Sequence, residues 1–281
     1  MKSDTATFRR LVWNHWRKNG RHDLPWRKTA DPYKILVSEV MLQQTQVPRV
    51  IPKYKSFLKR FATVRALAKA PLSAVLKEWS GLGYNRRGKY LHDAAKRIVV
   101  DFGGDFSAAL EHRLPGVGLY TGAAVRVFAF NEHEILIETN IRTALMHFLF
   151  SKDGSIPILR REPKYRDGKV RDAELVRIAR KTLEGQDPRK WHWALMDYGA
   201  YLKKSGVRNN RQSAHYAKQT KFEGSLREVR GAILRALHDG SKTEKALLSH
   251  IRSSKGYIKK ALTGLARDGL IVEKRGRWRI A

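Results

Sequence analysis

The chain contains 281 residues and no cysteine, and its 57 lysines and arginines outnumber its 26 aspartates and glutamates, which gives a formal net charge of +31. The missing thiols exclude a disulfide framework, a cysteine-ligated zinc site and a cysteine-held iron–sulfur cluster. With 42% hydrophobic and 10% aromatic residues, the sequence has enough apolar side chains to fold around a core.

The large positive charge indicates a polyanionic partner, because self-repulsion alone gives a protein no advantage. Nucleic acid is the first candidate. An acidic membrane surface is the rival, but the basic residues are not gathered in one cluster or one amphipathic helix. No run approaches the roughly 18 to 20 apolar residues of a membrane span, and the N-terminus lacks a cleavable apolar stretch. We therefore expect a cytoplasmic protein with no membrane partner.

The first domain is predicted to cover residues 1–204 and to be a series of helices, because apolar residues recur there at spacings of three and four. Asp31-Pro32 and Ala70-Pro71 are typical helix starts, and Gly103-Gly104 is a typical helix end. The apolar positions that carry the pattern include Ile35, Val40, Leu42, Val64, Leu67, Leu91, Ala95 and Ile98.

A short glycine-containing turn, Leu114-Pro-Gly-Val-Gly118, lies between two of these helices. Gly116 and Gly118 permit a tight turn and a close approach of the backbone to a ligand. The next helix begins at Leu119 with N–H groups that point outward, which is the arrangement that binds phosphate. A plain turn between two helices is the alternative, and the motif alone does not decide between them.

Residues 205–224 are polar, basic and aperiodic, which is typical of a connecting segment. Residues 225–281 regain the helical period in three short stretches and end in two short strands, Leu270–Lys274 and Arg277–Ile280, joined by a turn at Gly276. Three helices followed by a hairpin predict a winged-helix domain, whose third helix commonly contacts DNA.

Both parts of the chain are basic, since residues 203–281 hold 20 basic and 6 acidic residues, a net charge of +14, which leaves +17 for residues 1–202. In the third helix of the winged-helix domain, Lys255, Lys259 and Lys260 lie away from the apolar stripe. We predict that these three lysines contact DNA. An ordinary solvated basic face, or a domain that serves only for packing, is the alternative.

Several motifs in register point to one family. Leu114–Val125 resembles the helix-hairpin-helix of the base-excision DNA glycosylases related to endonuclease III, and within that superfamily the chain looks most like the adenine DNA glycosylases of the MutY type. The resemblance covers roughly residues 8–202 and implies a mostly helical glycosylase fold, here with a small C-terminal winged-helix domain of mixed α and β structure. The other matching motifs are Leu24–Arg27, Ser38–Val47, Gly81–Tyr84 and Met196–Ala200.

Cleavage of an N-glycosidic bond needs an acid for the leaving base and a negative charge for the sugar cation. Glu39 lies on an otherwise apolar stretch, where burial favours its protonated form, and the resemblance implies that it protonates adenine. A partly exposed structural glutamate is the alternative. Glu138 stands where the family has its catalytic aspartate, one methylene longer, and we expect it to stabilise the sugar cation, an inactive variant being the alternative.

The residue after Leu119 bears on the mechanism. Bifunctional relatives have a lysine there that forms a Schiff base with the sugar, whereas this chain has Tyr120. The resemblance therefore implies a monofunctional enzyme that uses water, with the Tyr120 hydroxyl assisting at the sugar or the ring simply packing in the core.

An enzyme of this class flips the target nucleotide out of the duplex. By resemblance, Gln44 and Tyr84 are wedge residues that enter the stack, and Leu24, Trp26, Arg27 and Asn140 bind the adenine. For Trp26 and Tyr84, ordinary packing in the core is the alternative. Glycines 81 and 83 give the loop before Tyr84 the freedom that a wedge requires.

The chain departs from the family in two places. Family members usually hold an iron–sulfur cluster with four cysteines after the segment that here is Met196–Ala200, and this chain has none, so we predict no such cluster and no other cofactor. Its ten histidines show no metal-ligand spacing, so we predict no metal site. A winged-helix domain also takes the place of the family's usual C-terminal domain, which helps to recognise 8-oxoguanine.

The sequence thus predicts a monomeric base-excision enzyme on double-stranded DNA, associated with the nucleoid, that removes adenine mispaired with 8-oxoguanine or guanine. Related thymine glycosylases share residues like Glu39 and Tyr120, so a thymine or uracil mismatch glycosylase is a rival, although the run Gln43–Gln46 favours adenine. A DNA-binding protein without catalysis is the other alternative.

Overall fold

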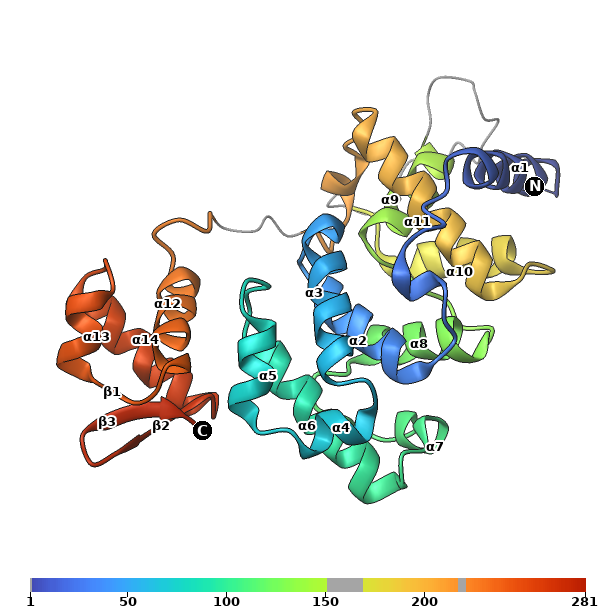
Figure 1. Cartoon of the computed structure of the whole chain (residues 1–281). Coiled ribbons are helices and arrows are strands. Elements are labelled where there is room, and N and C mark those ends of the chain that lie inside the picture. The colour runs from blue at the N-terminus through green and yellow to red at the C-terminus, as the bar shows by residue number, and fades with distance from the viewer. Residues whose placement is uncertain (1, 151–168, 217–220) are drawn as a thin grey trace. The chain divides into compact units, whose positions relative to one another are not determined.

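A computed structural model describes residues 2–150, 169–216 and 221–281 (Figure 1). They form two compact units, each made from two stretches of the chain. One unit contains Met1–Ala30 and Gly122–Lys218, and the other contains Asp31–Thr121 and Gln219–Ala281. The predicted mostly helical fold with a C-terminal part of mixed α and β structure is confirmed. The predicted division at residues 204 and 224 stays a prediction, and residues 217–220 of its connecting segment lie outside the described residues.

The first unit is helical, and α11 is its central element, packed against α1 and α9. Phe8 of α1 stacks on Phe148 of α9 with ring centroids 4.3 Å apart, and Trp191 of α11 meets Phe8 edge-on. These buried aromatic rings pack the three helices against one another. The elements are α1 (Lys2–Asn19), η1 (Pro25–Arg27), η2 (Arg126–Phe130), α9 (Thr139–Phe150), α10 (Asp172–Leu183), α11 (Pro188–Lys204) and η3 (Asn209–Gln212).

The N-terminal stretch of the second unit is also helical. Its first helix begins as the sequence predicts, because the Asp31 side chain accepts hydrogen bonds from the N–H groups of Tyr33 and Lys34. Close packing of α5 and α6 depends on Gly88, where a Cβ atom would come 2.9 Å from the Trp79 ring. The elements are α2 (Pro32–Leu42), α3 (Val47–Arg60), α4 (Val64–Lys69), α5 (Leu72–Trp79), α6 (Arg86–Phe102) and α7 (Phe106–Leu110), and α8 (Leu119–Val125) passes from this unit to the other.

The C-terminal stretch of the second unit has the three helices and the hairpin expected of a winged helix (Figure 1). Strands β2 and β3 pair antiparallel from Ile271 opposite Ile280 to Lys274 opposite Arg277, and Arg275 and Gly276 make the turn with positive φ. A two-residue strand, β1, adds to β3 and was not predicted. The elements are α12 (Leu226–His238), β1 (Lys242–Thr243), α13 (Glu244–His250), α14 (Lys255–Arg267), β2 (Ile271–Lys274) and β3 (Arg277–Ile280).

In the parts of the chain that the structure describes, no helix has the length and apolar character that crossing a membrane requires.

Candidate active site

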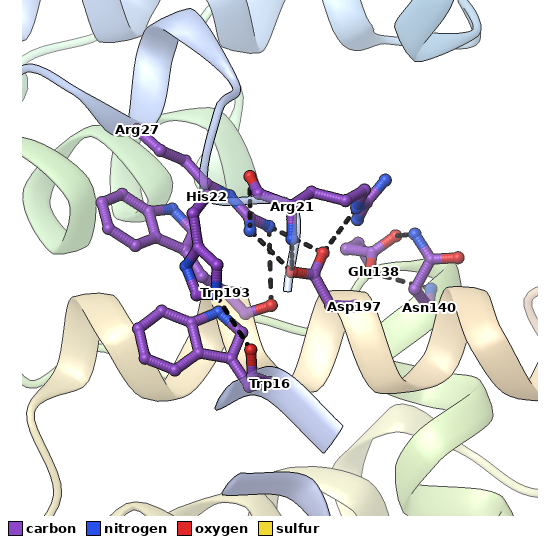
Figure 2. Close-up of polar contacts among 8 residues, drawn as sticks. All are labelled: Trp16, Arg21, His22, Arg27, Glu138, Asn140, Trp193 and Asp197. Carbon is purple, nitrogen blue, oxygen red and sulfur yellow. Dashed lines mark hydrogen bonds and ion pairs between the residues drawn. The ribbon is translucent and has the colours of Figure 1, made fainter. Parts of the chain in front are cut away.

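Glu138 lies at the beginning of α9, and its carboxylate folds back onto that helix (Figure 2). Its Oε1 accepts hydrogen bonds from the N–H groups of Asn140, at 2.8 Å, and Ile141, at 2.9 Å, and its Oε2 accepts one from the Asn140 side-chain amide at 3.2 Å. The positive end of the helix dipole also favours an anion at this position. The longer side chain of glutamate is therefore accommodated by capping the helix, and the negative charge has a fixed place.

Two opposing effects act on the Glu138 carboxyl. Burial raises its pKa above the ordinary value, and this effect prevails. The hydrogen bonds from Asn140 and Ile141, and the positive charges of Lys203 and Arg142, act in the opposite direction. Burial thus opposes the charged form of Glu138, and its neighbours favour it.

Lys203 is a member of this site that the sequence did not reveal. It lies in the last turn of α11, and its Nζ donates a hydrogen bond to the Asn140 Oδ1 at 3.0 Å. Asn140 thus contacts both Lys203 and the Glu138 carboxylate and fixes the orientation of its amide between them. A single lysine after Met196–Ala200 carries no pattern by which it could have been found.

Gly199 lets α11 approach α9 at the same place. A Cβ atom on Gly199 would come 1.9 Å from the Asn140 carbonyl oxygen, so no other residue fits without a shift of one helix. The glycine of the Met196–Ala200 motif therefore sets the position of the helix start that carries Glu138 and Asn140.

Of the predicted base-binding residues, Leu24 lies just before the short helix η1, and Trp26 and Arg27 lie in it. Leu24 and Trp26 are buried, at 8% and 7% exposure. The Arg27 guanidinium forms a two-point ion pair with Asp197, with Nη1–Oδ2 and Nη2–Oδ1 distances of 2.7 and 3.0 Å (Figure 2). The Arg27 guanidinium is thus paired with Asp197 of the Met196–Ala200 motif. Direct base binding by Leu24, Trp26 and Arg27 stays a prediction.

Arg21 completes the surroundings of Asp197 through its backbone N–H and its Nε, at 2.9 and 2.5 Å. Burial by itself would raise the pKa of the Asp197 carboxyl, but the hydrogen bond and charge of Arg27 and the charge of Arg21 outweigh burial and hold the pKa below its usual range. This buried cluster connects the segment after α1 to α11.

Glu39 belongs to the other unit, in α2. Its side chain is 9% exposed, and the residues beside it, Ser38 and Val40, are buried as well. The prediction of a buried glutamate on an apolar helix is therefore correct as to its environment, while its role as the catalytic acid stays a prediction.

The predicted wedge residues Gln44 and Tyr84 lie in two loops of that unit, and both have positive φ, at 54° and 46°. Such backbone is costly for residues other than glycine and is concentrated at functional sites. Arg87 joins the two loops, because its guanidinium donates to acceptors in both. Those acceptors are the carbonyl oxygens of Val40, Met41, Gln43, Leu82 and Gly83 and the hydroxyl of Thr45.

Arg87 thus binds the two loops that carry Gln44 and Tyr84 together from inside, and no pattern in the sequence indicates this role. Burial lowers its pKa to about 10, so the guanidinium still carries its charge at neutral pH. Its Cζ also lies 5.4 Å from the centre of the Tyr84 ring.

The turn before α8 has the geometry that its two glycines predict. Gly116 has φ of 70°, and a Cβ atom there would come 2.6 Å from Tyr90 Cβ. A Cβ atom at Gly118, in contrast, would have no described atom of the chain within 4 Å. Glycine at 116 is explained by the fold, and glycine at 118 is compatible with the approach of a ligand from outside. Tyr120 follows in the first turn of α8 and is half-buried.

The three lysines predicted to contact DNA, Lys255, Lys259 and Lys260, are all exposed on α14. Lys259 lies 3.9 Å from Glu244, a weak surface ion pair. Their exposure agrees with a nucleic-acid contact, which stays a prediction.

The residues present do not fit the cysteine-held cluster that the family usually carries, because the chain has no cysteine. Within the described residues, no group of three or more histidine, aspartate or glutamate side chains is placed to hold a metal ion. The segment after α11 is attached to α9 by asparagines instead. Asn209 Nδ2 donates to the Thr143 carbonyl at 3.2 Å, and Asn210 Nδ2 donates to the Thr143 hydroxyl at 2.6 Å.

Comparison with known proteins agrees with this geometry. Residues 37–186 match the HhH-GPD superfamily base excision DNA repair protein family. The chain belongs to this superfamily, as the resemblance in its motifs predicts.

Among curated relatives, the adenine DNA glycosylase of Buchnera aphidicola subsp. Baizongia pistaciae is 34% identical over 204 residues, which cover 70% of this chain and 53% of the relative. The adenine DNA glycosylase of Mycobacterium tuberculosis is 30% identical over 238 residues, which cover 79% of this chain and 76% of the relative. The chain thus spans only about half the length of the Buchnera protein.

Among solved structures, a thermostable thymine-DNA glycosylase matches with a TM-score of 0.58 and 26% identity, over 76% of this chain and 97% of that one. An endonuclease III–DNA covalent intermediate matches with a TM-score of 0.51 and 17% identity, over 74% of this chain and 88% of that one, and supports the fold alone.

Proposed function

We propose that this protein is a monofunctional DNA glycosylase of base excision repair that removes adenine mispaired with 8-oxoguanine or guanine from double-stranded DNA and leaves an abasic site. The observation that carries the proposal is the fixed carboxylate of Glu138 at the start of α9, in a chain similar to adenine DNA glycosylases over most of its length.

In this proposal, Glu39 donates a proton to the departing adenine as the N-glycosidic bond breaks. The sugar then carries positive charge, and the ionised Glu138 stabilises it electrostatically. Water adds to the sugar carbon and gives a proton to the Glu39 carboxylate, which restores the acid, so the products are free adenine and an abasic sugar. Tyr120 cannot form a Schiff base, which supports hydrolysis without strand cleavage.

Excision needs no metal cluster in this proposal. The absence of cysteine from the chain supports this, and so do the bonds from Asn209 and Asn210 to Thr143, which give the segment after α11 an attachment of its own. Treatment with a chelator should leave the rate of excision unchanged, and a loss of activity that iron restores would contradict this part.

A thymine or uracil mismatch glycosylase is a second candidate, because the similarity to the thermostable thymine-DNA glycosylase extends over nearly all of that chain. The test uses four duplexes that contain adenine opposite 8-oxoguanine, adenine opposite guanine, thymine opposite guanine and uracil opposite guanine. Alkali then cleaves the abasic sites. We expect product from the two adenine duplexes, and product from the thymine or uracil duplexes alone would overturn the proposal in favour of the second candidate.

Two variants test the catalytic assignment. Glu39→Gln and Glu138→Gln should each reduce single-turnover excision by about a thousandfold or more, while binding of the duplex is retained. Glu184→Gln is the matched control, since Glu184 is exposed. If Glu138→Gln retained the full rate, Glu138 would not be the stabilising carboxylate. Tight binding without excision by the unchanged protein would indicate a binding protein instead.

A further inference from the structure

The second unit contains a cavity of about 410 Å³ between its wedge loops and the first helix of its winged-helix part. The walls come from residues 44–46 and 80–85 on one side and from Phe222 and α12 on the other. Its volume is in the range of pockets that take small ligands. None of the functions assigned above uses the α12 side of this cavity.

The lining is suited to an anionic ligand with a flat ring. Three arginines, Arg49, Arg227 and Arg235, contribute to it, and no aspartate or glutamate is among the described residues that line it. Tyr84 and Phe222 supply aromatic rings. Arginines that neutralise phosphate beside rings that stack on bases are the combination by which proteins bind unpaired nucleotides.

Arg227 connects the two sides of the cavity. Its Nη1 donates a hydrogen bond to the Tyr84 hydroxyl at 2.5 Å, although the two residues are 143 positions apart. Its Cζ lies 5.1 Å from the centre of the Tyr84 ring and 6.0 Å from that of Phe222. Phe222 is 53% exposed, so its ring is accessible to a ligand.

On the wedge side of the cavity, the backbone at Tyr84 has a conformation that is costly for residues other than glycine. Tyr84 has positive φ, and Arg87 holds its loop from inside. The guanidinium of Arg227 lies over the Tyr84 ring, as does that of Arg87, so a base that stacks where Arg227 lies must displace Arg227. A guanidinium can move from the face of one ring to that of a stacked base with little loss of interaction.

We propose that this cavity binds the unpaired nucleotide of a DNA strand, with the base against Tyr84 and Phe222 and the adjoining phosphates near Arg227 and Arg235. The beginning of the winged-helix part would thus read DNA at the lesion, together with the wedge loops, in addition to any contact made by α14. This inference rests on the proposed function only in taking damaged duplex DNA as the substrate.

The test compares the affinity for two duplexes by fluorescence anisotropy. One duplex is fully paired, and the other has a stable abasic analogue opposite a guanine, which leaves that guanine unpaired. The unchanged protein should bind the second duplex at least about tenfold more tightly, since stacking of one base on aromatic rings is worth about this much. Arg227→Ala should reduce the preference to about twofold or less, and Phe222→Ala should reduce it severalfold.

Arg252→Ala is the matched control, because Arg252 is exposed in the same part of the chain and is not in the cavity lining. It removes the same charge and should weaken the binding of both duplexes by the same factor. Thermal unfolding of each variant shows whether it is folded, and Phe222→Ala provides a second test that removes an exposed ring and keeps the Arg227 charge.

Two results would overturn the inference. One is a preference for the unpaired guanine that Arg227→Ala and Phe222→Ala reduce no more than Arg252→Ala does. The other is binding of free deoxyguanosine monophosphate that requires Arg227 while the duplex preference does not, which would assign the cavity to a free nucleotide.

The excision assay on the same preparations separates this inference from the proposed function. If the protein excises the base but its preference for the unpaired guanine does not depend on Arg227 and Phe222, the inference alone is overturned. If the protein excises no base from any duplex but its preference for the unpaired guanine still requires Arg227, the proposed function is overturned and the inference is supported.

Discussion

The Lys203 ammonium donates a hydrogen bond to the Asn140 Oδ1 at 3.0 Å, and the Asn140 amide donates in turn to the Glu138 carboxylate. The last turn of α11 is thereby connected to the beginning of α9 through three polar side chains. Burial opposes the charge of Glu138, and Lys203 favours it. If Glu138 stabilises the sugar cation as proposed, Lys203 is a positioning residue that acts on the reaction through Asn140 and Glu138.

Lys203→Met should shift the acid limb of the pH–rate profile to higher pH. Without the positive charge, the pKa of Glu138, already raised by burial, rises further, so a smaller fraction of the carboxylate is ionised at a given pH. We expect a shift of roughly one pH unit and a rate that recovers at higher pH. Single-turnover rates across a pH series measure it.

Two companions make this test specific. Lys203→Arg keeps the positive charge and should restore most of the normal profile, and Lys204→Met removes a charge from the exposed neighbouring position and should not shift it. A uniform loss of rate in Lys203→Met at every pH, without a shift, would contradict the electrostatic role.

Asp197→Asn should destabilise the folded protein strongly at neutral pH. The Arg27 and Asp197 side chains are only 4% and 1% exposed, so the substitution leaves a buried guanidinium without its counter-charge. The expected cost is about 3–5 kcal/mol in the free energy of unfolding, measured by denaturant titration. Asp23→Asn, at a fully exposed side chain, is the control that should leave stability unchanged.

The pH dependence of that difference has a definite sign. The pKa of Asp197 in the folded protein is below its usual value, so its contribution is fully present above the pKa of the unfolded chain, about 4. It is lost as the pH falls through the folded pKa. The difference between the two proteins should thus be constant from about pH 5 to 7 and shrink below about pH 4. A difference that grows on acidification would show that the ion pair is not its source.

The two glycines of the turn before α8 should respond differently to alanine. Gly116→Ala should destabilise the protein by about 1–3 kcal/mol, because positive φ and the clash with Tyr90 both penalise a Cβ atom. Gly118→Ala should leave stability nearly unchanged and weaken duplex binding by about tenfold, the loss of one charge-assisted hydrogen bond to a phosphate. Unchanged binding by Gly118→Ala would contradict the phosphate contact.

The sequence predicts those parts of the fold that local patterns determine. Apolar residues at helical spacing predict the helices, and two short strands around Gly276 predict the β2–β3 hairpin, whereas β1, with two residues, is too short to have a pattern. The glutamate at 138 is identified through its family motif. The motif does not predict that Glu138 caps α9, because the cap depends on hydrogen bonds from the backbone N–H groups of Asn140 and Ile141.

Other contacts that the sequence does not predict join residues that are far apart in the chain. Arg27 and Asp197 are 170 positions apart, and Arg227 and Tyr84 are 143 apart. Two family motifs contain Arg27 and Asp197, yet neither motif indicates that they bind each other. No local pattern in the sequence indicates such a pair, and arginine is compatible with an exposed position as well as with a buried one.

Arg87→Lys should loosen both wedge loops while the charge is kept. A lysine ammonium is a compact charge and cannot reproduce the planar set of donors by which Arg87 contacts the two loops at once. Several carbonyl oxygens would lose their partners, so we expect a loss of about 1–3 kcal/mol in the free energy of unfolding. The preference for a duplex with an unpaired guanine should also fall, because Gln44 and Tyr84 would no longer be held in their positive-φ conformations. Arg86→Lys, at a neighbouring exposed position of the same helix, is the control for both measurements. If Arg87→Lys matched Arg86→Lys in stability and in duplex preference, the loops would not depend on the buried guanidinium.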